Sequence, residues 1–399
     1  MKQSADKAVI GVIALAHAVS HFFQLTLAPL FPLIKEDLGV SYASLGFAVA
    51  LFYALSAFGQ PLAGFIVDRF GGRAVLVVGM SGLTLGMTIV GFSSSYPALV
   101  AGAAVAGLGN SVFHPADFSI LNARVGADRL GYAYSAHGVA GAFGYAASPM
   151  FSGGFALVFG WHGALFAVAG VGVAMVLLLL SQWNRLGAAE PAAAKKSAAP
   201  VDLRVIFALP VVMCFLYFTL YACGLSGVQS FSVAAMRVQY EVAAAFASSA
   251  LTAYMIGSAA GIFTGGIIAT RSARHDLVAA SGLFLGACSV FAIASHAISA
   301  GALPVALGFA GYCIGATGPS RDMIVRASTP AGATGRVYGF VYSGFDVGGF
   351  LMPTFYGWLM DHNLPQGVFY LSAGFTLIAM ATVLNLPGRR IRGQAPNSV

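Results

Sequence analysis

Four polar residues inside a long apolar segment are the first sign of chemistry in this sequence. The stretch GLGNSVFHPADFSILNAR, residues 107–124, contains Asn110, His114, Asp117 and Arg124. At ~100° per residue, a helix places these four side chains within about 80° of arc. An ionisable side chain that faces lipid costs at least ~2.5 kcal/mol, so such residues normally face a bundle interior or a water-filled cavity. The stripe predicts a transport pathway or a binding site; a hydrogen-bonded seam between helices is the alternative.

The composition predicts a membrane protein. Of the 399 residues, 58% are hydrophobic and 8% are charged, whereas soluble domains average about 25% charged residues. At roughly 20 to 25 residues per crossing, the chain has room for about twelve transmembrane helices. The first apolar run passes through Ala14-Leu15-Ala16, which resembles a cleavage site, and continues to Ile34. We interpret it as an uncleaved first helix.

We predict an all-α polytopic membrane protein whose twelve helices form two pseudo-symmetric six-helix halves. The predicted spans are 8–34, 42–66, 74–93, 97–125, 132–158, 161–181, 205–234, 242–269, 277–296, 299–327, 335–360 and 366–386. Residues 182–204 are rich in Ala and Pro, which is typical of a flexible linker. This cytoplasmic linker separates an N-terminal bundle, 1–181, from a C-terminal bundle, 205–399.

The distribution of Lys and Arg predicts the orientation of the chain. One set of loops and both termini carry seventeen of the twenty basic residues: Lys2, Lys7, Arg69, Arg73, Arg124, Arg129, Arg185, Lys195, Lys196, Arg204, Arg271, Arg274, Arg326, Arg336, Arg389, Arg390 and Arg392. The opposite loops carry Lys35 and Arg237, and Arg321 lies within a span. Because cytoplasmic loops carry the excess, we predict cytoplasmic termini and a place in the cell inner membrane. Because the basic residues are spread over many separate loops, the net charge of +7 does not indicate nucleic-acid binding.

The two halves are related in sequence. A shift of 204 residues maps Gly107 onto Gly311, Pro115 onto Pro319, Gly131 onto Gly335, Tyr134 onto Tyr338, Gly144 onto Gly348 and Pro149 onto Pro353. Six helices per half, entered from the same side, predict a parallel repeat about an axis along the membrane normal. Substrate sites in such transporters lie between the repeats near mid-membrane.

Two cytoplasmic turns share a pattern of glycine and charge. The turn after the second span reads GFIVDRFGGR from Gly64, and the turn after the eighth reads GIIATRSAR from Gly266. Asp and Arg side chains in such turns can bridge to neighbouring helix termini. We predict a gating latch, and charge that only sets the topology is the alternative. The latch residues would be Asp68, Arg69, Arg73, Arg271 and Arg274.

The first of these turns resembles the signature of the major facilitator superfamily, G-x-x-x-D-R-x-G-R/K-R/K. The matching residues are Gly64, Asp68, Arg69, Gly71 and Arg73, and the second turn keeps Gly266, Arg271 and Arg274. Residues 144–153 resemble the superfamily's antiporter motif in the fifth helix, with Ser148 and Ser152 in two glycine places. Ala103 replaces the arginine of its drug/proton antiporters. Residues 113–115, FHP, are similar to the fourth helix of fosmidomycin-resistance-type exporters.

In that superfamily, helices 1, 4, 7 and 10 line a central cavity, and the resemblance implies the same arrangement here. The implied substrate-binding residues are Arg321, Tyr217, Tyr221, Gln24, Asn110 and Gln229. The predicted proton-coupling residues are His17, His21, His114, Asp117, Asp322 and Asp346. Histidine changes charge near pH ~6.5, and desolvation favours the neutral form of a buried carboxyl group. For His137, on the fifth span, packing is the favoured interpretation.

Arg321 is the most informative of the candidates. Its planar, permanently charged guanidinium suits a carboxylate or phosphonate in bidentate geometry. The alternative role is a structural ion pair with Asp322, Asp117 or Asp346. Adjacent residues on a helix point ~100° apart, so we do not expect Arg321 to pair with Asp322.

These features predict a secondary active transporter. We expect a monomer that moves a small organic anion by alternating access, coupled to protons. The alternative is a proton-driven drug or metabolite exporter of the fosmidomycin-resistance type. The sequence has no H-E-x-x-H or G-x-S-x-G motif of a membrane enzyme, and a receptor or scaffold is the third, less favoured class. The predicted partners are a small-molecule substrate, protons and the lipid bilayer, with no cofactor, metal or nucleic acid.

Overall fold

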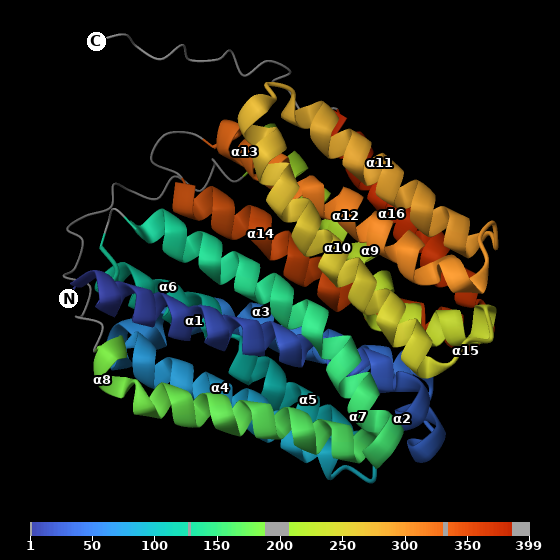
Figure 1. Ribbon diagram of the computed structural model, residues 1–399, viewed down its shortest axis with the longest axis horizontal. Coiled ribbons are helices and arrows are strands. Elements are labelled where there is room, and N and C mark those ends of the chain that lie inside the picture. The colour runs from blue at the N-terminus through green and yellow to red at the C-terminus, as the bar shows by residue number, and fades with distance from the viewer. Residues whose placement is uncertain (1, 127–128, 188–206, 330–333, 385–399) are drawn as a thin grey trace.

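The computed structural model describes residues 2–126, 129–187, 207–329 and 334–384, and every regular element within these ranges is a helix. Most of the long helices lie roughly along one common axis. They form two bundles that lie side by side, one from each half of the sequence (Figure 1). This arrangement confirms the predicted all-α fold in two halves.

Seven α-helices and the 3₁₀ turn η1 belong to the described part of the N-terminal bundle. They are α1 (Lys2–Gln24), η1 (Ala28–Leu30), α2 (Phe31–Leu38), α3 (Tyr42–Phe70), α4 (Gly72–Gly91), α5 (Tyr96–Asn110), α6 (Phe113–Arg124) and α7 (Leu130–Ser181). The first predicted span is divided between α1 and α2, because Pro29 and Pro32 lack the amide hydrogen that a helix interior requires. Gly39, with a φ of 61°, ends α2.

The C-terminal bundle follows the short helix α8 (Trp183–Leu186), with which the predicted linker 182–204 begins. Its elements are α9 (Leu209–Gln239), α10 (Ala244–Arg271), α11 (His275–Ala294), η4 (Ala300–Ala302), α12 (Leu303–Ala316), α13 (Gly318–Ala327), α14 (Thr334–Leu351), α15 (Pro353–Asp361) and α16 (Pro365–Leu384). Most of the predicted linker lies outside the described residues, so the proposed domain boundaries stay predictions.

Ten segments of the described chain are long and apolar enough to cross a membrane. One of them, Tyr132–Ser181, has 50 residues and includes Gly160, whose φ of 67° is not helical. Because a crossing needs roughly 20 residues, this segment is long enough for the fifth and sixth predicted spans. Helices α14 and α15 occupy the eleventh predicted span, although they are not among the ten. The number twelve remains a prediction.

The sequence pattern predicted one continuous helix over 107–124, and this prediction is wrong. Helix α5 ends at Asn110, and α6 begins at Phe113 after a turn. A similar break separates α12 from α13 at Thr317. The prediction that Arg124 shares a helix face with Asn110, His114 and Asp117 is therefore wrong. Arg124 is exposed and donates a hydrogen bond to the Arg185 carbonyl oxygen.

Equivalent glycines bring helices into close contact in both halves. A Cβ atom on Gly107 would overlap the backbone of Phe52 in α3, and a Cβ atom on Gly311 would overlap the backbone of Tyr254 in α10. Small residues allow this kind of close approach between membrane helices. The 204-residue repeat seen in the sequence is thus a repeat of helix packing as well.

The two bundles meet along α3, which contacts α14 and α15, and along α7, which contacts α10. One apolar core cluster extends through both halves and includes Phe31 and Phe231, whose ring centroids are 5.2 Å apart. The halves therefore form one packed body.

Candidate functional site

A cluster of histidines around one aspartate lies inside the N-terminal bundle, where α1, α6 and α7 come together. Asp117 on α6 is fully buried, and its Oδ2 lies 3.0 Å from His137 Nε2 on α7 and 3.5 Å from His17 Nδ1 on α1. The rings of His17 and His137 are stacked, with centroids 3.5 Å apart. His137 is thus a direct partner of Asp117, a role that the sequence did not suggest because the two lie on different helices.

His21 and His114 extend this cluster toward accessible space. The ring centroid of His17 lies 4.3 Å from that of His21 and 5.3 Å from that of His114. His114 is exposed, whereas His17 is buried. The structure therefore gathers all four residues of the N-terminal half that were predicted for proton coupling.

A chain of polar side chains lies next to the cluster and links four helices. Gln24 Nε2 donates to Asn110 Oδ1 at 3.2 Å, and Asn110 Nδ2 donates to Ser56 Oγ at 2.9 Å. The hydroxyl of Tyr145 donates to Gln24 Oε1 at 2.6 Å. Two predicted substrate residues, Gln24 and Asn110, are thus brought together, while Ser56 and Tyr145 are additions from the structure.

Arg321 is surrounded by aromatic rings in the C-terminal bundle. Its guanidinium carbon lies 4.7 Å from the ring centroid of Phe218 and 5.3 Å from that of Phe345. Stacking of this kind is typical of arginine. Tyr217 and Tyr221, both predicted for substrate binding, also interact electrostatically with Arg321. Gln229 lies farther along α9 and is partly buried.

The expectation that Arg321 would not pair with Asp322 is wrong. Arg321 Nε donates to Asp322 Oδ1 at 3.1 Å, and the Tyr342 hydroxyl donates to the same oxygen at 2.8 Å. The long arginine side chain bends back far enough to overcome the ~100° between neighbouring residues on a helix. Asp322 thus fixes one edge of the guanidinium.

Asp346 lies where α14 of the C-terminal bundle meets α3 of the N-terminal bundle. Its carboxyl group is partly buried and interacts electrostatically with Tyr53 and Tyr145. Gly349, one turn later, lies against the Tyr53 ring. Asp346 makes no hydrogen bond or ion pair with any residue that the structure describes. Asp346 is therefore an acid with polar neighbours and with no cation beside it in the described part of the chain.

The predicted latch residues lie within their own halves. Arg69 contacts the ring of Phe70, and Arg73 donates to the Trp183 carbonyl oxygen at 3.1 Å. Arg274 forms two hydrogen bonds with Asp276, and this bonding raises the pKa of its guanidinium. Arg271 is exposed, and the side chain of Asp68 lies outside the described part of the structure. The latch stays a prediction.

The halves are joined instead by Asp361, at the end of α15. Its carboxylate accepts hydrogen bonds from the amides of Tyr42 at 2.7 Å and Ala43 at 2.8 Å, at the start of α3. Lys35 Nζ donates to it at 3.3 Å. A carboxylate at a helix N-terminus is stabilised by the free amides and the helix dipole. We call these contacts the Asp361 clasp.

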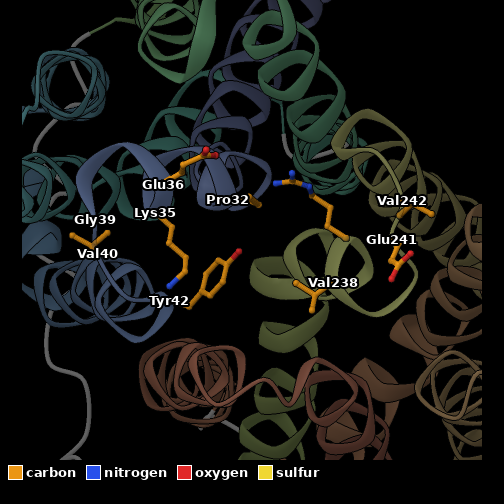
Figure 2. Close-up of a pocket in the computed structure, with 10 residues that line it drawn as sticks. Pro32, Lys35, Glu36, Gly39, Val40, Tyr42, Val238, Glu241 and Val242 are labelled. Carbon is orange, nitrogen blue, oxygen red and sulfur yellow. The ribbon is translucent and has the colours of Figure 1, made fainter.

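A cavity of about 760 Å³ lies beside the clasp, between the end of α2 and the end of α9. Figure 2 shows Lys35 and Tyr42 on one side of this cavity, with Val238 and Glu241 on the other. The Lys35 ammonium lies 4.7 Å from the centroid of the Tyr42 ring. Since the cavity also contains Glu36 and Arg237, its charges balance, and it shows no strong preference for an anion.

The fold and the buried charges inside it define a polytopic membrane transporter. A family model described as Major Facilitator Superfamily matches residues 13–236 and 224–398. The chain belongs to the Major Facilitator Superfamily, as its cytoplasmic turns had predicted. It is a multi-pass membrane transporter, and not an enzyme.

Individual relatives agree with this assignment. The fosmidomycin resistance protein of Escherichia coli (strain K12) is 24% identical over 390 residues, which cover 96% of this chain and 93% of that protein. An oxalate:formate antiporter of Oxalobacter formigenes is 37% identical over 81 residues, only 20% of this chain and 19% of that protein.

A solved structure supports the fold. It is a bacterial homolog of the human lysosomal transporter Spinster, in an inward-facing and occupied conformation. The TM-score is 0.77 at 15% sequence identity, over 94% of this chain and 96% of that chain. The likeness shows a shared fold.

Proposed function

We propose that this transporter moves a small organic anion across the inner membrane by alternating access and that proton movement drives it. The observation that carries the proposal is Arg321, a largely buried cation within a membrane bundle. A buried cation without sufficient compensation costs several kcal/mol. Asp322 provides part of this compensation at Nε, and an anionic solute would supply the rest at the two terminal nitrogens.

The surroundings of Arg321 leave two of its nitrogens available to such a solute. Asp322 accepts from Nε, while the two terminal nitrogens make no hydrogen bond with the residues that the structure describes. These nitrogens form the part of the guanidinium that binds a carboxylate or phosphonate in bidentate geometry. Phe218 and Phe345 fix the plane of the group.

Asp346 is the proton carrier that these surroundings favour. Among the predicted acids, Asp117 is bonded to imidazole and Asp322 to Arg321, but Asp346 has no cation in contact within the described residues. Carboxyl groups inside membrane transporters often serve as proton relays. Its place between the bundles would link protonation to their relative movement.

The Asp361 clasp supports alternating access. It joins the bundles at the N-terminal end of α3. A Cβ atom on Gly46, one turn further along, would overlap the backbone of Pro353. At the other end of α3, a Cβ atom on Gly64 would have nothing within 4 Å. With cytoplasmic termini, as proposed, the closed end is the outer one and the protein is inward-facing.

The direction we propose is export. The relative that covers nearly the whole chain is named for fosmidomycin resistance, and removal of a toxic solute from the cell is a direct route to resistance. A proton-driven drug or metabolite exporter of that type is the second candidate function. It differs from the first in requiring no negative charge on the solute.

Flux into proteoliposomes tests both candidates. The purified chain is reconstituted, an inside-acidic pH gradient is imposed, and uptake of fosmidomycin, small carboxylates, phosphonates and neutral apolar drugs is measured. We expect anions to accumulate against their gradient and the accumulation to collapse when a protonophore is added. Liposomes without protein and the same liposomes without a pH gradient are the controls.

Two results would overturn the proposal. Uphill transport at an unchanged rate after the protonophore is added would exclude proton coupling. Equal transport of neutral drugs and anions would exclude selection by Arg321 and favour the general exporter.

A further inference from the structure

We propose that the buried group formed by His17, Asp117 and His137 is a binding site for a divalent transition-metal ion such as Zn²⁺. The three residues come from α1, α6 and α7, which meet inside the N-terminal bundle (Figure 1). One ligand atom from each lies within 4.8 Å of the others. The sequence predicted His17 and Asp117 for proton coupling and indicated no metal, because the three ligands are far apart along the chain.

The distances between the ligand atoms fit a metal shell. Tetrahedral zinc bonds of about 2.0–2.1 Å place neighbouring ligand atoms about 3.3 Å apart. Asp117 Oδ2 lies 3.0 Å from His137 Nε2 and 3.5 Å from His17 Nδ1. An ion could therefore be held with small movements of the side chains.

Two buried polar atoms in the group lack a hydrogen-bond partner. They are His17 Nδ1 and Asp117 Oδ1, and both residues are more than nine-tenths buried. Leaving a buried polar atom unsatisfied costs about 1–3 kcal/mol. A cation bound at Asp117 Oδ2 and His17 Nδ1 would satisfy His17 Nδ1 directly and would neutralise the carboxylate to which Oδ1 belongs.

The cluster also offers further ligands, one of which is exposed. His17, His21 and His114 form a second possible group, and His114 is exposed. A Cβ atom on Gly141 would lie 2.8 Å from His21 Nδ1, so glycine at this position makes room for the ring. His114 or a water molecule would complete the fourth position of a tetrahedral shell.

The ligand set selects the class of metal. Neutral imidazoles with one carboxylate suit Zn²⁺, Co²⁺, Ni²⁺ or Cu²⁺, whereas Mg²⁺ and Ca²⁺ prefer oxygen ligands. The proposal concerns binding alone, so it holds or fails independently of the solute and of Arg321.

Cobalt titration of the purified, full-length, tag-free protein tests the site. Co²⁺ in a tetrahedral site gives intense visible absorption bands, which Zn²⁺ removes by displacement. We expect one Co²⁺ per chain with such bands. His137→Gln and Asp117→Asn should each weaken binding at least ~10-fold, since even partners outside the first shell contribute 10–100-fold in known sites.

His275→Gln is the matched control. This histidine is also buried, but it lies in the C-terminal bundle, 3.4 Å from Ser320 Oγ. Its replacement should leave the bands and the affinity unchanged. His114→Gln, at an exposed position, provides a second test if the buried variants fail to fold, and it should alter the band shape or the affinity.

Three outcomes would overturn the proposal: no tetrahedral bands, binding that survives both His137→Gln and Asp117→Asn unchanged, or binding lost equally in His275→Gln. The exclusion of Mg²⁺ and Ca²⁺ from the site is an additional expectation, and displacement of Co²⁺ by equal amounts of either ion would contradict it.

Discussion

Asp117 in the N-terminal bundle and Arg321 in the C-terminal bundle occupy equivalent positions, yet they carry opposite charges. The 204-residue shift that maps Gly107 onto Gly311 also maps Asp117 onto Arg321. Each residue follows a break in its helix, between α5 and α6 in one half and between α12 and α13 in the other. The two halves therefore share the same arrangement of helices at this position but differ in the charge of the side chain.

The neighbours of the two residues differ as much as their charges. Asp117 is fully buried against the imidazoles of His17 and His137. Arg321 lies against the rings of Phe218 and Phe345 and keeps two nitrogens unbonded to the described residues. The difference suggests a division of labour, in which the N-terminal site attracts cations and the C-terminal site attracts anions.

The largest effect is expected from Arg321→Gln. Removal of the charge should reduce the affinity for an anionic solute by at least ~100-fold, since charged hydrogen bonds contribute about 1.5–3 kcal/mol each and two are lost. Arg321→Lys, which keeps the charge but loses the fork, should weaken binding by ~1.5–3 kcal/mol. Binding to purified protein measures both effects.

The control for Arg321→Gln is Arg326→Gln, an exposed arginine in the last turn of the same helix. It should bind the solute normally. If Arg321→Gln also binds and transports normally, Arg321 is structural and the C-terminal site is not the anion site.

Asp346→Asn should uncouple transport from protons. The carboxyl group lies between the bundles, near Tyr53 and Tyr145, so a neutral amide in its place keeps the shape and loses the proton. We expect uphill flux driven by a pH gradient to disappear while solute exchange continues. Proteoliposome flux with and without the gradient measures this. If the variant still concentrates solute, another residue carries the proton.

Asp117→Asn should affect stability more than anion binding. The change removes the negative acceptor beside two buried imidazoles, and an imperfectly satisfied buried group costs about 1–3 kcal/mol. Thermal unfolding should therefore occur at a lower temperature, while the affinity for an anionic solute should stay within about two-fold, because sites without shared partners act independently.

Asp6→Asn is a suitable comparison for Asp117→Asn, since Asp6 is also buried in the N-terminal bundle and its Oδ2 lies 3.4 Å from Arg129. Equal loss of anion binding in Asp117→Asn and Arg321→Gln would mean that the two equivalent positions form one site.

Many spans could be placed from the sequence because hydropathy largely determines where the chain crosses the membrane, although it does not show the breaks inside a span. For example, the predicted span 74–93 corresponds to α4, Gly72–Gly91. The contact between His137 and Asp117 could not be predicted, because it depends on how α6 and α7 pack. The pairing of Arg321 with Asp322 was missed for another reason, since a helical wheel ignores the reach of a long side chain.

Tyr342→Phe is expected to have the smallest effect, and it tests whether Asp322 positions Arg321. The Tyr342 hydroxyl and Arg321 Nε bond to the same oxygen of Asp322, at 2.8 Å and 3.1 Å. The lost hydrogen bond is worth about 0.5–1.5 kcal/mol, and its effect on Arg321 is indirect. We expect anion affinity to fall about two- to ten-fold with no change in pH coupling. Tyr370→Phe, at an exposed tyrosine of α16, should change nothing. A loss as large as that of Arg321→Gln would show instead that the Tyr342 hydroxyl contacts the solute itself, and the C-terminal site would then extend from α13 onto α14.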